Sequence, residues 1–96
     1  MNGPDLTIDV QGTPNPNAAK FVLDRTVPGE GSRSYFNADA AAEDALAARL
    51  FAVEGVRALL LVDNFITVTK TEDADWDSLV RDVQQAIAAE LTERSG

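Results

Sequence analysis

The stretch that most constrains the fold is residues 55–70, GVRALLLVDNFITVTK, which predicts a β-hairpin. Val56–Val62 and Phe65–Lys70 are rich in aliphatic and β-branched residues, which favour strands. Asp63 and Asn64 lie between them, and both tolerate the positive φ that a two-residue hairpin turn requires. A lone hairpin is only marginally stable in water, so the rest of the chain must supply more strands and helices.

The two strands of this hairpin differ in pattern. In the second strand Ile66 and Val68 face one side and the residues between and around them face the other, which indicates a sheet with one face on the core. In the first strand three leucines follow one another at positions 59–61. This run predicts a central strand that is more fully buried.

The chain before the hairpin predicts three further strands. Leu6–Val10 alternates apolar and polar residues, as a half-buried strand does. Two prolines and two asparagines in Gly12–Asn17 end that strand, and Lys20–Val27 predicts the second one. Pro28–Ser32 is a loop by composition, and Arg33–Phe36 predicts a short third strand that turns one of its two aromatic rings inward.

Two amphipathic helices flank the hairpin. The first is predicted to begin at an N-cap of Asn37 or Asp39, to carry an apolar stripe that includes Leu46 and Leu50, and to stop at Gly55.

The second helix is predicted to be capped by Asp73 or Asp75 and to carry an apolar stripe from Trp76 to Leu91. Trp76 is the largest apolar side chain in the sequence, and we expect it to lock this helix onto the sheet. The order of elements predicts an α+β fold, an antiparallel sheet of four to five strands with two helices packed on one face. Residues 1–96 are expected to form a single domain.

The sequence contains no cysteine and no histidine. This excludes disulfides, thiolate chemistry, the usual zinc sites, cysteine-ligated iron–sulfur clusters and a histidine acid–base catalyst. We therefore expect no catalytic residue, no metal ligand and no bound cofactor.

The net charge is −8 at pH 7, from 16 acidic and 8 basic residues. This charge repels a phosphate backbone or an anionic membrane, and it provides solubility or suits a basic partner surface. The longest apolar run, Ala58–Val62, is far shorter than the roughly 20 residues that span a bilayer. The first ten residues lack the pattern of a secretory signal peptide. We therefore expect a cytoplasmic monomer that binds neither nucleic acid nor a membrane.

Asp73, Asp75 and Asp77 resemble the opening of a calcium-binding loop. The positions that would need glycine and a bidentate glutamate hold Ser78 and Gln84, so we interpret the three aspartates as the acidic start of a helix. No other carboxylates have the spacing of an acid–base pair. A small carboxylate-based ligand-binding or enzymatic domain is kept as the alternative function.

The segment Thr13–Asn17, TPNPN, is stiffer than a connector between two strands needs to be. Prolines fix φ, and asparagine side chains can cap nearby backbone groups. The segment either fixes the register of the two strands or forms a pre-ordered recognition loop. The candidate partner-binding residues are therefore Thr13, Pro14, Asn15, Pro16 and Asn17.

Three segments resemble the N-terminal domain of Nfu/NifU-like iron–sulfur cluster scaffold proteins. They are TPNPNAAKF at Thr13–Phe21, LAARLFAVEGV at Leu46–Val56 and DNFITVTKTEDADWDSL at Asp63–Leu79. In that family the domain often precedes a second one whose Cys-x-x-Cys pair holds a transferable cluster, and it also occurs alone. The present sequence departs from the two-domain pattern because it has no cysteine.

The resemblance implies a non-enzymatic docking module in iron–sulfur cluster assembly or delivery, without a cluster site of its own. Its partner would be a protein, either a separate cluster carrier or a recipient apoprotein.

Overall fold

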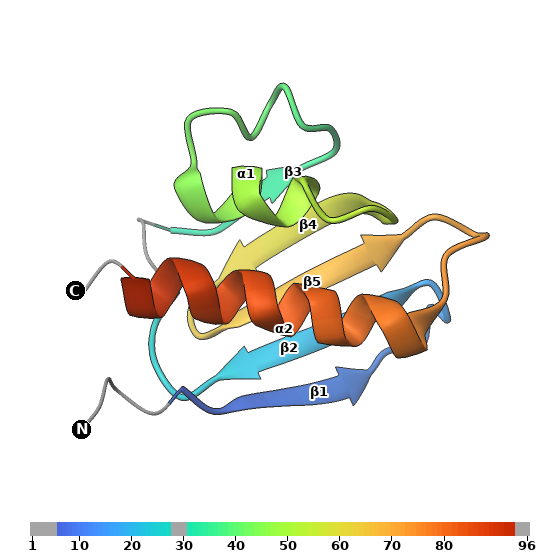
Figure 1. The fold of residues 1–96 in the computed structure, drawn as a ribbon, viewed down its shortest axis with the longest axis horizontal. Coiled ribbons are helices and arrows are strands. Elements are labelled where there is room, and N and C mark those ends of the chain that lie inside the picture. The colour runs from blue at the N-terminus through green and yellow to red at the C-terminus, as the bar shows by residue number, and fades with distance from the viewer. Residues whose placement is uncertain (1–5, 28–30, 94–96) are drawn as a thin grey trace.

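A computed structural model describes residues 6–27 and 31–93 as one antiparallel sheet with two helices on one of its faces (Figure 1). The predicted α+β fold is confirmed, and five strands form the sheet. The elements are β1 (Ile8–Gly12), β2 (Ala18–Leu23), β3 (Arg33–Tyr35), α1 (Ala45–Phe51), β4 (Val56–Val62), β5 (Phe65–Lys70) and α2 (Trp76–Glu93).

The strand order is β1-β2-β5-β4-β3, so β5 is the central strand and β1 and β3 are the edges. The predicted hairpin is present, and Asp63 in its turn has φ +48°. The alternation in β5 is also confirmed, because Ile66 and Val68 are fully buried. The leucine-rich strand β4 is an interior strand, between β5 and β3. The prediction that it is more fully buried is wrong, because Leu60 points to the face without helices and is 37% exposed.

The first hairpin, β1–β2, differs from its prediction at its ends. The second strand stops at Leu23, not at Val27. Val27 is nevertheless buried, and its backbone N–H donates to the Asp63 carbonyl oxygen at 2.7 Å. The segment after β2 is thus fixed to the central hairpin without being part of the ladder. Of the predicted loop Pro28–Ser32, residues 28–30 lie outside the described part of the chain.

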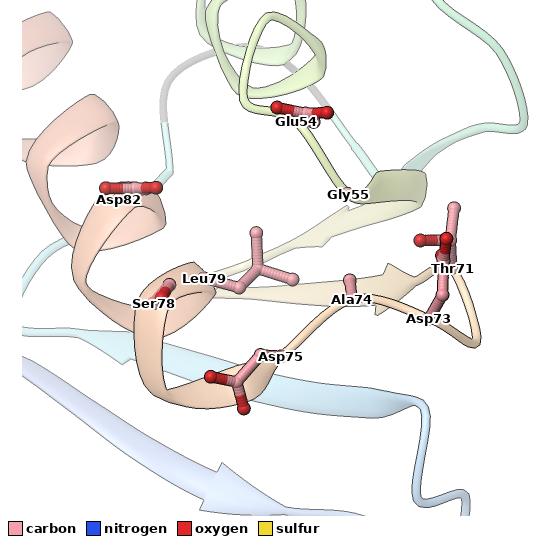
Figure 2. A pocket seen from close by; sticks show the side chains of 9 residues that line it. All are labelled: Glu54, Gly55, Thr71, Asp73, Ala74, Asp75, Ser78, Leu79 and Asp82. Carbon is pink, nitrogen blue, oxygen red and sulfur yellow. The ribbon is translucent and has the colours of Figure 1, made fainter.

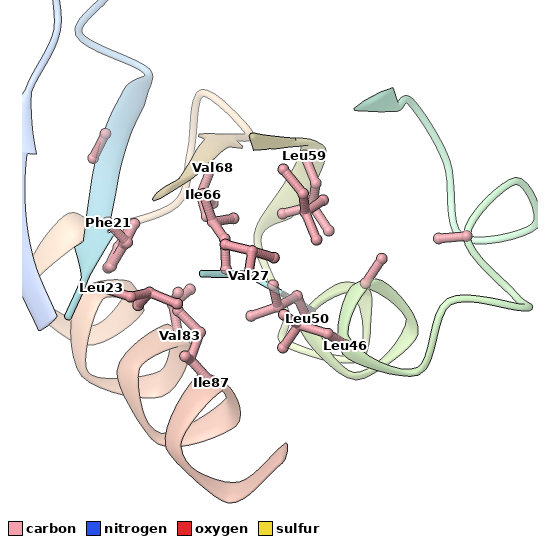
Figure 3. Packing of buried hydrophobic residues seen from close by; sticks show 14 of the residues in the cluster. Phe21, Leu23, Val27, Leu46, Leu50, Leu59, Ile66, Val68, Val83 and Ile87 are labelled. Atoms are coloured by element: carbon pink, nitrogen blue, oxygen red, sulfur yellow. The ribbon is translucent and has the colours of Figure 1, made fainter. Parts of the chain in front are cut away.

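The core lies between the sheet and the two helices (Figure 3). Phe21 from β2, Ile66 and Val68 from β5 and Leu61 from β4 supply the sheet side, and all four are fully buried. The helices supply Leu46, Leu50, Val83 and Ile87, which are spaced four residues apart on each helix and so share one face of it. Burying such side chains stabilises the fold by about 1.5–3 kcal/mol each.

Helix α1 begins later than predicted. Its N-cap is Asp44, whose carboxylate accepts a hydrogen bond from the Ala47 backbone N–H at 3.1 Å. Asn37 instead caps a preceding turn by accepting from the Ala40 N–H at 2.7 Å, so the prediction of Asn37 or Asp39 as the helix cap is wrong. Helix α1 ends at Phe51 with Ala52 as its C-cap, so the prediction that it stops at Gly55 is wrong. Gly55 directly precedes β4, and its φ of +102° is open to glycine but strained for other residues.

Helix α2 begins at Trp76, and the carbonyl of Asp75 accepts the Leu79 N–H at 3.0 Å. Trp76, which was expected to lock this helix onto the sheet, packs against the core as a half-buried side chain. In β3, Tyr35 is the aromatic residue that turns inward, whereas Phe36 is 76% exposed. Neither helix in the described ranges is long and apolar enough to cross a membrane.

Candidate functional site

The Thr13–Asn17 loop joins β1 to β2 and is held in shape by its own polar groups. The Thr13 hydroxyl lies 2.9 Å from the Asn15 carbonyl oxygen and 3.0 Å from that of Ala18, and it accepts the Asn15 N–H. The Asn15 side-chain oxygen accepts the Asn17 N–H at 2.9 Å. These are the local bonds by which Thr and Asn side chains stabilise turns, so the loop is ordered before it meets any partner.

Two residues from the other end of the chain anchor this loop. The backbone N–H and the Nζ of Lys70, at the end of β5, donate to the Asn17 carbonyl oxygen at 2.7 Å and to its side-chain oxygen at 3.1 Å. The indole Nε1 of Trp76 donates to the Pro16 carbonyl oxygen at 2.9 Å. The loop is therefore tied to both the central strand and the start of α2.

Lys70 is the notable member of this group because it is only 8% exposed. A buried ammonium is costly unless it is hydrogen-bonded. Besides Asn17, its Nζ lies 3.3 Å from the Thr71 carbonyl oxygen and 5.9 Å from the centre of the Trp76 ring. The ammonium group of Lys70 therefore has two hydrogen-bond acceptors, the Asn17 side-chain oxygen of the loop and the Thr71 carbonyl oxygen.

The five predicted site residues differ in exposure. Pro14, Asn15 and Pro16 are exposed, whereas Thr13 and Asn17 are half-buried. All of them except Pro14 take part in the bonds described above that shape and anchor the loop. Sequence reasoning did not identify Lys70 and Trp76 as anchors, because their contacts join positions more than fifty residues apart.

Beside the loop is a shallow hollow of about 280 Å³ between β1 and α2. Its walls are mostly apolar and include Val10, Ala19, Trp76 and Val80, and the loop forms part of its rim. Gly12 lines it as well, and a Cβ on Gly12 would meet nothing within 4 Å. The hollow is of a size to take one apolar side chain.

A second hollow, of about 530 Å³, lies where α2 begins (Figure 2). Its rim carries the carboxylates of Glu54, Asp73, Asp75 and Asp82, and all four residues are exposed. A carboxylate-based ligand site or enzyme would be favoured by a buried acid beside such a hollow, and none of these four is buried. Within the described ranges no group of three or more acidic side chains is placed to hold a metal ion.

The buried acids of the described residues lie elsewhere and have structural partners. Asp44 accepts from the Arg33 guanidinium and, at 3.0 Å, from the Tyr35 hydroxyl. Burial raises the pKa of Tyr35, and the neighbouring Asp44 carboxylate raises it further. Glu90 on α2 accepts from Arg49 on α1 at 3.2 Å, which ties the two helices together. Asp44 had a sequence signal, since it directly precedes the apolar stripe of α1.

Residues 8–94 match the family model of the scaffold protein Nfu/NifU N terminus. The chain belongs to this family. The three segments that suggested the resemblance fall at the loop, at α1 with the following turn, and at β5 with the start of α2. They therefore include the loop, both of its anchors and the hollow at the start of α2.

Curated relatives carry this domain as a part of a longer protein. NifU-like protein 5, mitochondrial, of Arabidopsis thaliana is 37% identical over 81% of this chain and 28% of its own length. The human NFU1 iron-sulfur cluster scaffold homolog, mitochondrial, is 38% identical over 85% of this chain and 33% of its own length. The chain thus spans about a third or less of the length of these relatives.

Solved structures agree with the fold. The solution structure of a NifU-like protein from Saccharomyces cerevisiae superposes with a TM-score of 0.76 at 27% identity, and covers 95% of this chain and 83% of that one. The crystal structure of protein SAV1430 from Staphylococcus aureus gives a TM-score of 0.71 at 31% identity, over 82% of this chain and 95% of that one.

The expectation of a cytoplasmic protein is wrong, because the curated relatives are named as mitochondrial proteins. That expectation rested on the lack of a secretory signal pattern and of an apolar membrane span. Mitochondrial transit peptides have neither feature, since they are amphipathic and rich in arginine and serine. The composition of a folded domain does not indicate the compartment to which the protein is targeted.

Proposed function

We propose that this chain is a non-enzymatic docking module of iron–sulfur cluster assembly, and that the Thr13–Asn17 loop is its contact with a partner protein. The family supports the link to cluster scaffolds. The proposal extends this to a single domain, residues 1–96, that works as a monomer, holds no cluster itself and contacts a cluster carrier or a recipient apoprotein.

One observation carries the choice of the loop. Lys70 and Trp76 hold it from two sides, yet Pro14 and Asn15 at its tip stay exposed. A loop that only connected β1 to β2 would not need a buried ammonium and an indole N–H to hold it. Because the loop is already ordered, a partner that binds it pays little conformational entropy.

The charge of the chain supports a basic partner surface. With a net charge of −8 it attracts such a surface over a Debye length of about 8–10 Å and speeds encounter. The acidic hollow at the start of α2 lies on the helix whose first residue anchors the loop, so both could face one partner.

The test is to titrate the isotopically labelled chain with a purified cluster-carrier protein and to repeat the titration with Pro14→Arg. Pro14 is exposed, so the variant is expected to keep its melting temperature within a few degrees and to lose binding. Ala42→Arg is the matched control, because it adds the same charge at an exposed position before α1 and should bind normally. If Pro14→Arg binds as tightly as the control, the loop is not the contact.

A further inference from the structure

Strand β1 has only one neighbour among the described residues, so one of its sides is an open sheet edge (Figure 1). The register shows which groups lie there. The Asp24 N–H donates to the Thr7 carbonyl oxygen at 3.2 Å, and Ile8 pairs with Leu23. Hydrogen-bonded pairs alternate along an antiparallel ladder, so Asp9 and Gln11 bond toward β2. The N–H and C=O groups of Ile8, Val10 and Gly12 therefore point outward.

The pairing of β2 with β5 gives the same result independently. The Leu23 N–H donates to Asn64 at 2.7 Å and the Lys70 N–H donates to Asn17 at 2.7 Å, so the odd-numbered residues of β2 bond toward β5. Its even-numbered residues, Lys20 and Val22, then bond toward β1, where they pair with Gln11 and Asp9.

Two hollows lie one after the other along this open edge, between β1 and α2, and together they are called the groove. At one end it contains the apolar hollow lined by Val10, Gly12, Trp76 and Val80. At the other end it contains a hollow of about 470 Å³ that Ile8 and Arg81 line. The side chains of β1 that enter the groove belong to the same residues whose backbone groups point outward.

We propose that this groove binds an extended segment of a partner protein as a sixth strand, antiparallel to β1. Backbone bonds to Ile8, Val10 and Gly12 would supply affinity, and side chains on one face of the added strand would supply specificity. This inference rests on the proposed function, which makes the ligand a protein. It adds that the bound part of that protein is an extended segment, and it specifies the side chains of that segment.

The two hollows define the segment. In a strand, residues two and four apart share a face, and directly opposed residues point to the same side of the sheet. The residue opposite Gly12 therefore enters the apolar hollow, and the residue opposite Ile8, four positions later in the partner, reaches Arg81. Among the described residues that line the two hollows, Arg81 alone is charged, in a chain of net charge −8. The segment accordingly has an apolar residue followed four positions later by a carboxylate.

Short peptides test this directly. The probe is a seven-residue peptide with leucine at its second position, glutamate at its sixth, and threonine and valine between them. Proton–nitrogen spectra and amide exchange follow its binding. We expect slowed exchange at the amides of Val10 and Gly12, with exchange at Asp9 and Gln11 unchanged because these already bond to β2. A peptide with lysine in place of the glutamate should bind about tenfold more weakly.

Gly12→Leu is the decisive variant, because its side chain would enter the apolar hollow from a position with open space around the Cβ. It should fold normally and lose about tenfold or more in affinity for the peptide. Asp9→Leu is its matched control, because Asp9 is an exposed residue of the same strand that lines neither hollow, and this variant should bind as the unaltered chain does.

Equal affinity of Gly12→Leu and Asp9→Leu, or no change at the Val10 and Gly12 amides at millimolar peptide, would overturn the proposal. Slowed exchange at these amides that grows with protein concentration in the absence of peptide would also overturn it, since the occupant would be a second copy. Pro14 lies outside the groove lining. Pro14→Arg therefore reports on the loop alone, and failure of one test leaves the other intact.

Discussion

At the scale of single residues, Lys70 and Trp76 explain how a loop can be both rigid and exposed. Lys70 donates from the end of β5 to the Asn17 side-chain oxygen, and Trp76 donates from the start of α2 to the Pro16 carbonyl oxygen. Neither bond is local in sequence. The charged ammonium of the buried Lys70 makes a stronger hydrogen bond than a neutral donor would. The rigidity of the loop therefore depends on two residues outside it, and the loop's own sequence does not indicate them.

Tyr35 provides a pH-dependent prediction at this scale. Burial and the Asp44 carboxylate raise its pKa in the folded state. Its contribution to stability is therefore complete below the unfolded pKa of about 10 and is lost as pH rises through the folded value. At pH 7 Tyr35→Phe should cost about 1 kcal/mol through the lost hydrogen bond. Above pH ~10 this difference between the two proteins should shrink.

Urea unfolding of both proteins between neutral and strongly alkaline pH measures the effect. The comparison cancels the titration of lysines and arginines, which both proteins share. A difference in unfolding free energy that stays constant over the whole range would contradict the assignment of a raised pKa to Tyr35.

At the scale of secondary-structure elements, the start of α1 shows what an apolar pattern can and cannot predict. The pattern locates the helix, whereas tertiary contacts decide which residue caps it. The apolar stripe located the helix, but Asn37, Asp39 and Asp44 all precede it, and each is a residue type that caps helices. Asp44 is the cap because it also meets Arg33 and Tyr35 of the edge strand β3. That contact is tertiary and has no local signal.

Two substitutions test this element. Asp44→Ala removes the helix cap and a buried partner of Arg33, and should cost about 2–4 kcal/mol. Asp39→Ala, at the exposed residue that sequence favoured as a cap, should change stability by less than about 0.5 kcal/mol. Thermal and chemical unfolding of the two variants would refute the capping assignment if the two costs were similar. Asp44→Asn keeps the cap and loses the charge, so it should fall between them.

Strand and helix types were predictable because period-2 and period-3.6 apolar patterns report directly which face meets the core. Strand order was not. Three consecutive leucines suggested a strand that is buried more fully than the others, and β4 is indeed an interior strand, but Leu60 is left half-exposed. The middle position belongs to β5, because β2 pairs with it. The candidate loop was found from its prolines and asparagines. Its anchors, and the groove between β1 and α2, arise only when distant segments are brought together.

At the scale of the whole molecule, the sheet has one face under two helices, one exposed face and two edges. The Thr13–Asn17 loop, the apolar hollow and the open edge of β1 all lie at one end of the β1–β2 hairpin or along it. A single partner could engage the loop tip and the groove together, and two linked contacts bind more tightly than either alone.

The last prediction concerns the cluster itself. The sequence offers neither cysteine nor histidine, and carboxylates are hard ligands that suit magnesium, calcium or manganese better than a sulfide cluster. After reconstitution with iron and sulfide, the isolated chain should leave gel filtration without a stoichiometric cluster absorption band. A cluster-carrier protein treated in the same way is the positive control. With that carrier present, the chain should co-elute with it while the iron stays at the carrier's own ratio. A cluster band that persists on the chain alone would show that it carries a site of its own, and docking would no longer account for its role.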